Sequence, residues 1–162
     1  MEKLRKFFFF FHSVYHAVAL LTQELVQQGY QMLNEQNSWE LTPGGKYYLT
    51  RGGSALIAFQ IPEATPKGFL FSASHSDRPT FKLKENGELT GRYTRLSTEK
   101  YGGMLIAPWL DRPLSVAGRV QVETQTGVQS RLLDVDQDLL LIPNVAIHMN
   151  RKANEGYSWN PA

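Results

Sequence analysis

The feature that most constrains the fold is a short run without charged side chains that ends at a histidine. Residues 69–74, Phe-Leu-Phe-Ser-Ala-Ser, do not show the alternation of a strand with one solvent-exposed face. A continuous run of this kind is typical of a strand covered on both faces, as in a sheet packed between layers. We therefore expect a strand at 69–74 that is buried on both faces.

A candidate metal ligand follows this run. His75 stands at its carboxyl end, and Asp77 comes two residues later. Ligands bind at the carboxyl ends of strands in α/β sheets, and a metal-bound histidine has its other ring nitrogen held by a neighbouring group. The pattern suits His75 as a ligand oriented by Asp77. An ordinary polar turn is the alternative, because a zinc site needs three or more ligands.

The composition limits which partners and which metal ligands the chain can have. With 162 residues, 42% hydrophobic and 20% charged, it is long enough for one ordinary domain or a piece of something larger. The net charge of +2 comes from mixed signs, so we expect neither nucleic acid nor a membrane as a partner. There is no cysteine, so histidine and carboxylate side chains would have to hold any metal.

The N-terminus has a basic head and five consecutive phenylalanines, Phe7 to Phe11. A signal peptide has this general pattern, but histidines interrupt the apolar stretch and no clean cleavage site follows. No apolar run approaches the length of a membrane helix. We expect a first helix whose Phe side chains pack on a core, and a cytoplasmic protein.

Further along, the pattern predicts one helix and several strands. Ser13 is a plausible N-cap for a helix that ends near Gly29. Glycine-containing turns separate the expected strands. The segments are 46–50 and 54–61 around Arg51-Gly52-Gly53, 80–84 ending at a turn at Asn86-Gly87, 115–123 and 128–135 around Thr126-Gly127, and 138–142. The composition changes near residue 90, because residues 91–103 are polar and contain several glycines. We place a domain boundary there.

Other polar residues have simple structural explanations. His148 fits a polar position at a strand end, and His12 and His16 share one helical face without the glutamate of a metalloprotease motif. The pair Asp111-Arg112 stands among apolar residues, where it would satisfy backbone groups. A loose basic cluster fits a solvated face: Lys82, Lys84, Arg92, Arg95 and Lys100.

Four blocks of sequence together resemble the M18 metallopeptidases, the aspartyl aminopeptidase and aminopeptidase I group. They are residues 38–59 (SWELTPGGKYYLTRGGSALIAF), 72–86 (SASHSDRPTFKLKEN), 99–120 (EKYGGMLIAPWLDRPLSVAGRV) and 142–156 (IPNVAIHMNRKANEG). The resemblance runs in order from about Val14 to the end. It implies that this chain corresponds to the N-terminal part of such a protein.

The resemblance implies a zinc-dependent enzyme that removes N-terminal, acidic or neutral, residues from peptides. It implies an α/β catalytic domain, a helix plus a mixed sheet, over residues 1–90, followed by the start of a β-rich inserted domain at 91–162. Members bind two zinc ions and form homo-oligomers. Carried over by motif, His75 is a zinc ligand, Asp77 is the catalytic-site residue that orients it, and His148 binds substrate or zinc.

The same resemblance shows what is missing from these 162 residues. The catalytic glutamate pair and later metal ligands of the family have no counterpart, since no Glu-Glu occurs. Arg78 follows the His-x-Asp motif where a small residue is usual, and the Phe tract replaces a mixed helix. We therefore expect the isolated chain to lack a complete active site. A non-catalytic assembly fragment, or the product of a damaged or partial gene, is the alternative.

Overall fold

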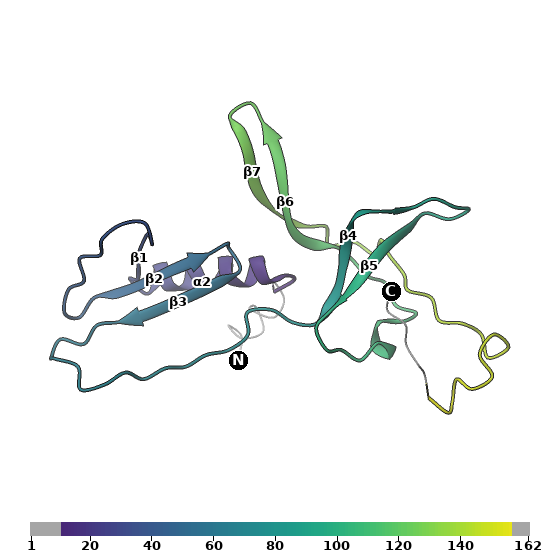
Figure 1. The fold of residues 1–162 in the computed structure, drawn as a ribbon, viewed down its shortest axis with the longest axis horizontal. Helices are drawn as coiled ribbons and strands as arrows, with labels where there is room; N and C mark the ends of the chain where they lie inside the picture. Colours follow the sequence, from purple (N-terminus) through teal and green to yellow (C-terminus); the bar gives the residue numbers. More distant parts are fainter. Residues whose placement is uncertain (1–10, 157–162) are drawn as a thin grey trace. The chain divides into compact units, whose positions relative to one another are not determined.

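The computed structural model describes residues 11–156 (Figure 1). The chain divides into two compact units. The first consists of Met1–Asp77 and Ala117–Asp134, and the second of Arg78–Val116 and Val135–Ala162. Apart from Phe11, the predicted Phe-rich helix lies outside the described residues. The domain boundary at residue 90 stays a prediction, since it concerns the domains of a whole family chain.

The first unit begins with helix α2, Val14–Gln27. Ser13 caps it: its backbone is extended, and its Oγ accepts a hydrogen bond from the backbone N–H of His16 at 3.4 Å. Past the helix end, Gly29 has a φ of 82°, a left-handed conformation that glycine adopts without strain. The predicted helix and both of its end signals are confirmed.

A mixed three-stranded sheet follows in the same unit, in the order β1-β2-β3. The short strand β1, Gln31–Met32, runs parallel to β2, Lys46–Arg51, which pairs antiparallel with β3, Ala55–Gln60. Gly52 and Gly53 both have positive φ in the turn between β2 and β3. The hairpin predicted around these glycines is confirmed.

A second hairpin completes the first unit, although it lies far along the chain. Strands β6, Ala117–Thr124, and β7, Gly127–Asp134, pair antiparallel over eight residues each. Arg119 on β6 donates from Nη1 to the carbonyl oxygen of Gly52 at 2.7 Å. Its guanidinium carbon also lies 4.3 Å from the ring centroid of Tyr15 on α2. Arg119 therefore connects the two hairpins and the helix.

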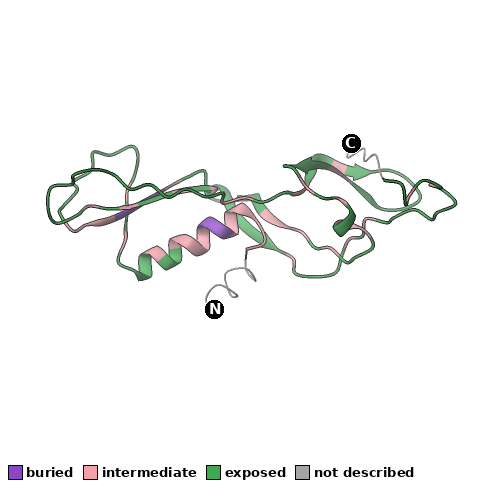
Figure 2. Ribbon diagram, turned by 90° about the horizontal axis from the view of Figure 1, so that it is seen from below, coloured by how far each residue is buried: buried purple, intermediate pink, exposed green. Residues whose placement is uncertain are grey.

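Few side chains are buried in the described part of the chain, as Figure 2 shows. Ala17 and Val18 are buried on α2, and Tyr47, Tyr48 and Leu49 on β2. Successive strand residues point to opposite faces, so burial of all three on β2 means that this strand is covered on both sides. On one of them, the rings of Tyr47 and Phe59 lie 5.7 Å apart.

The second unit contains another antiparallel pair, β4 (Thr80–Leu89) with β5 (Arg95–Tyr101). The turn predicted at Asn86-Gly87 is wrong, because β4 continues through it. The register shifts between Leu83 and Glu88, so the extra residues form a β-bulge, with Asn86 at a φ of 53°. Strand β5 was not expected, since its Arg-Leu-Ser-Thr-Glu-Lys-Tyr sequence carries little apolar alternation.

The strand predicted at 138–142 forms only in part. Leu140 and Ile142 make isolated bridges with Leu114 and Leu110. A short 3-10 helix, Ala107–Trp109, precedes Leu110, and the ring of Trp109 meets that of Phe81 edge to face at 5.4 Å. The second unit is thus held by one strand pair and a few local contacts.

The buried strand predicted at 69–74 is not formed. These residues belong to no strand, and Phe69, Leu70 and Phe71 are 85%, 101% and 86% exposed. The described residues provide no neighbouring strand for this run and no layer on either side of it. The fold class nevertheless agrees with the prediction: a helix combined with mixed and antiparallel sheets is an α/β arrangement.

Candidate metal centre

His75 and Asp77 lie together at the end of the first unit's first segment. The ring Nδ1 of His75 and the carboxylate Oδ1 of Asp77 are 2.8 Å apart. The side chain between them fixes this short stretch, because Ser76 donates from Oγ to the carbonyl oxygen of Ser54 at 2.8 Å. A three-residue turn anchored next to β3 therefore places the imidazole and the carboxylate within hydrogen-bonding distance.

This geometry leaves one nitrogen of His75 open. With the proton on Nδ1 and donated to Asp77, Nε2 carries the free lone pair that a metal needs. The side chain of His75 is 92% exposed, and that of Asp77 is 33% exposed. Exposure keeps the imidazole accessible and means that no other described group holds it in place. The neighbouring Arg78 is also exposed.

The described residues do not make up a whole zinc site. Among residues 11–156, no three histidine, aspartate or glutamate side chains gather where they could hold a metal ion. Zinc sites use three or four protein ligands, so His75 with Asp77 fits one ligand and its support.

His148 lies in the second unit, whereas His75 lies in the first. It occupies the exposed turn at 147–149, where the N–H of Met149 bonds to the carbonyl of Ala146 at 2.8 Å. The strand end expected for it is therefore a turn. Its roles in substrate and metal binding stay predictions.

Asp111, by contrast, has a local structural role. Its Oδ1 accepts a hydrogen bond from the backbone N–H of Asn144 at 2.8 Å, and its own N–H donates to the carbonyl of Ile142 at 3.0 Å. It adopts a φ of 53° to make both contacts. This matches the expectation that Asp111 satisfies backbone groups.

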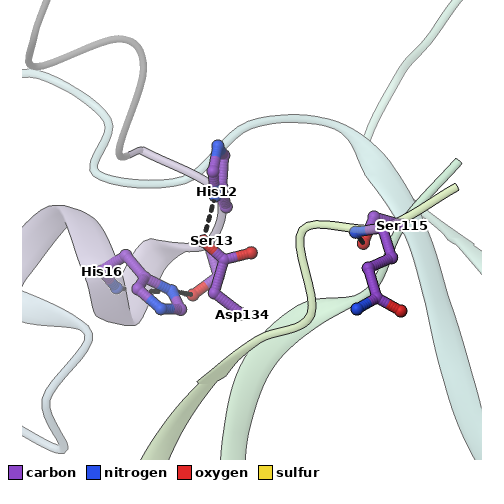
Figure 3. A network of polar contacts seen from close by, with 6 residues as sticks. His12, Ser13, His16, Ser115 and Asp134 are labelled. Carbon is purple, nitrogen blue, oxygen red and sulfur yellow. Dashed lines mark hydrogen bonds and ion pairs between the residues drawn. The ribbon is translucent and has the colours of Figure 1, made fainter.

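A second polar cluster forms where α2 begins (Figure 3). His12 and Asp134 of β7 pair at 2.5 Å, and Ser13 bonds to the ring of His16 at 2.8 Å. Burial lowers the pKa of His16, an effect that Asp134 opposes and His12 supports. Sequence inspection found the two histidines but not Asp134, because 122 residues separate it from His12 and no local pattern links them.

This second cluster supports the fold rather than a reaction. The Oγ of Ser13 is already engaged as the cap of α2, so it is not an unencumbered nucleophile. The contact between His12 and Asp134 joins the start of the helix to the last residue of β7. The candidate metal ligand and this cluster are thus separate features of the same unit.

Comparison with known proteins identifies a family. The model of the M18 family, described as aminopeptidase I zinc metalloprotease, matches residues 7–162. A protein of Clostridium acetobutylicum named as a probable M18 family aminopeptidase 2 is 41% identical over 166 residues. That match covers 99% of this chain and 38% of the relative, so the chain spans a little over a third of the relative's length.

Solved structures of aminopeptidases also match this chain. A chain in the cryo-EM structure of the Ape4 and Nbr1 complex superposes with a TM-score of 0.85 and 39% identity, over 97% of this chain and 31% of that one. The S. cerevisiae mApe1 dodecamer gives a TM-score of 0.77 and 26% identity, over 91% of this chain and 36% of that one. The chain therefore matches part of those larger proteins and spans about a third of their length.

Proposed function

Because the chain belongs to the M18 family of aminopeptidases, we propose that it supplies the N-terminal part of a zinc-dependent aminopeptidase. The reaction is removal of an N-terminal residue, acidic or neutral, from a peptide. The observation that carries this proposal is the contact between His75 and Asp77 within a chain matched by the family model.

In this proposal His75 gives a metal its Nε2, and Asp77 holds the ring in the required tautomer and orientation. Zinc, when bound, would activate a water molecule and polarise the scissile carbonyl. The remaining ligands and the general base belong to the part of the family's length that this chain does not match. His148 contributes to substrate or metal binding from the β-rich part.

We also propose that residues 1–90 belong to the catalytic domain and that residues 91–162 begin an inserted domain. The dodecamer among the matched structures supports homo-oligomers for the complete protein. No helix in the described part of the chain has the length and apolarity needed to cross a membrane. A cytoplasmic location stays a prediction.

A chimaera tests the peptidase function directly. The region of the Clostridium acetobutylicum relative that matches this chain is replaced by residues 1–162, and release of an N-terminal aspartate from a peptide is measured with Zn²⁺ or EDTA. We expect activity that EDTA abolishes. Changing a group that orients a metal ligand costs roughly 10-fold to 100-fold, and we expect this loss for Asp77→Asn and a larger one for His75→Ala.

The control is His16→Gln, a histidine of the same unit outside the proposed site, which should keep full activity near neutral pH. Chimaera activity that survives His75→Ala would contradict the role given to His75. A folded chimaera without any EDTA-sensitive activity would favour the alternative, a non-catalytic assembly fragment or a damaged gene product.

A further inference from the structure

The pair Asn86-Gly87 forms no turn, and it takes no part in the candidate metal centre. Asn86 is the only asparagine of the chain that precedes a glycine. In such a pair the backbone nitrogen of the second residue can attack the side-chain amide carbon of the first, because the five-membered ring that results is unstrained. Glycine has no Cβ to obstruct this approach. The pair is therefore a candidate for a covalent change.

Asn86 lies in a stretch of β4 that is not paired with β5. The paired register stops at Leu83 and resumes at Glu88, so residues 84–87 have no partner position on the other strand. The φ of 53° at Asn86 is also far from that of a strand. Regular pairing holds a backbone extended, whereas a bulge interrupts the ladder that does so. The pairing of β4 with β5 therefore does not restrain Asn86 as it restrains the residues on either side.

Solvent also reaches this pair. Asn86 is exposed, and Gly87 is half-buried. Exposure matters because the reaction releases ammonia and then consumes water. Asn37 in the first unit is exposed as well, but Ser38 follows it, and the side chain of serine crowds the attacking nitrogen. Among these two exposed asparagines, Asn86 alone combines access to solvent with an unobstructed nitrogen.

We propose that Asn86 is a site of spontaneous deamidation through a cyclic succinimide. The nitrogen of Gly87 forms a bond to Cγ of Asn86, the bond from Cγ to Nδ2 breaks, and ammonia leaves with the proton from the attacking nitrogen. Water then opens the ring at either carbonyl. Opening at Cγ gives aspartate. Opening at the backbone carbonyl carbon gives isoaspartate, in which the main chain runs through the former side chain.

The two products differ in their effect on β4. Both lower the formal net charge of +2 by one and place a carboxylate between Glu85 and Glu88. Aspartate keeps the length of the backbone and tolerates positive φ. Isoaspartate adds an atom to the main chain, in a bulge where a Cβ on Gly87 would already lie 2.9 Å from the carbonyl oxygen of Lys84. The bulge accommodates aspartate, and isoaspartate loosens the β4–β5 pair.

Ageing of the full 162-residue chain at slightly alkaline pH tests the proposal. Isoelectric focusing measures the acidic form, and peptide mass spectrometry locates the change and separates isoaspartate from aspartate. We expect the acidic form to arise first at Asn86, with isoaspartate among the products. The rate in the folded chain should lie within roughly 10-fold of the rate in guanidinium chloride, because the bulge opens without unfolding of the whole chain.

Matched variants separate this site from the other asparagines and the added charge from the added atom. Asn86→Gln should remove the early acidic form, because its longer side chain closes a six-membered ring more slowly. Asn37→Gln is the control and should age as fast as wild type. Asn86→Asp supplies the charge without the extra atom. Amide exchange in β5 should match that of fresh wild type in Asn86→Asp and be roughly 10-fold faster in the purified isoaspartate form.

Three results would overturn the proposed site. They are an acidic form that arises as fast in Asn86→Gln as in wild type, aspartate at this position without isoaspartate, which would indicate direct hydrolysis of the amide, and a rate in the folded chain more than roughly 10-fold below that in guanidinium chloride. Equal exchange in the isoaspartate form and in Asn86→Asp would contradict the effect on β4. None of these measurements requires zinc or peptidase activity.

Discussion

Two residues near the start of α2 differ in what determines their role: the local sequence for Ser13, and a contact with a distant strand for His16. Ser13 is recognisable as a cap from its place before an apolar periodicity, and the structure confirms it. His16 is different, because its environment includes Asp134, which comes from β7. Its ionisation is therefore a property of the folded first unit and not of the helix sequence.

This environment makes the stability of the first unit depend on pH. The folded pKa of His16 lies below 6.5, chiefly because of burial, so the unfolded chain binds more protons between the two pKa values. Stability that is present above pH 6.5 is lost as the pH falls through that window. We expect His16→Gln to reduce the drop in urea midpoint between about pH 7.5 and about pH 5.5.

The control for this prediction is His148→Gln, at an exposed turn of the other unit. It should leave the pH dependence of the first unit unchanged. A drop in midpoint that is the same in wild type and His16→Gln would show that groups other than His16 account for the acid sensitivity.

At the scale of single elements, β4 shows why a turn signal can mislead. Asn-Gly is a strong hairpin signal by itself, yet here Asn86 and Gly87 are absorbed as a bulge inside one strand. A Cβ added at Gly87 would lie 2.9 Å from the carbonyl oxygen of Lys84, which is closer than such atoms approach. The bulge therefore requires glycine for space.

Gly87→Ala should destabilise the β4–β5 pair for this reason. Overpacking of this kind costs roughly 1–3 kcal/mol, which equilibrium urea unfolding of the chain can measure. Gly103→Ala in the same unit is the matched control, because a Cβ there meets nothing within 4 Å. If both variants unfold at the same urea concentration, the close approach at Lys84 does not constrain β4.

At the scale of the whole molecule, the first unit is discontinuous in sequence: residues 117–134 belong with residues 1–77. Arg119 is one of the side chains that make this connection, through Gly52 and Tyr15. With so few buried side chains in the described residues, polar contacts of this kind account for a larger share of the unit's stability than in a domain with a full core.

Arg119→Met keeps most of the apolar stem and removes both contacts. A cation–π contact at an exposed site contributes about 0.5–1 kcal/mol and a hydrogen bond about 1 kcal/mol. We expect the first unit to lose about 1.5–2 kcal/mol of unfolding free energy, with faster amide exchange in β6. Arg131→Met on the paired strand is the control. Equal losses of unfolding free energy in the two variants would contradict the proposal that Arg119 connects the two hairpins and the helix.

The sequence by itself determined the local features. Capping and periodicity define α2, paired glycines define the β2–β3 turn, and the four motif blocks identify the family that the comparisons confirm. His75 and Asp77 were predictable as a pair because a single residue separates them, and short range makes the contact a property of the local chain.

Only the tertiary structure decided the features that depend on neighbours. It brought Asp134 next to His12, which lies 122 positions earlier in the sequence. It also placed Asn86 and Gly87 in a bulge of β4 rather than in a turn, because β4 pairs with β5 on both sides of them. Residues 69–74 have the sequence of a buried strand yet remain exposed. A strand is formed by hydrogen bonds to a second strand and is buried by layers above and below it, and neither is supplied by the segment's own residues.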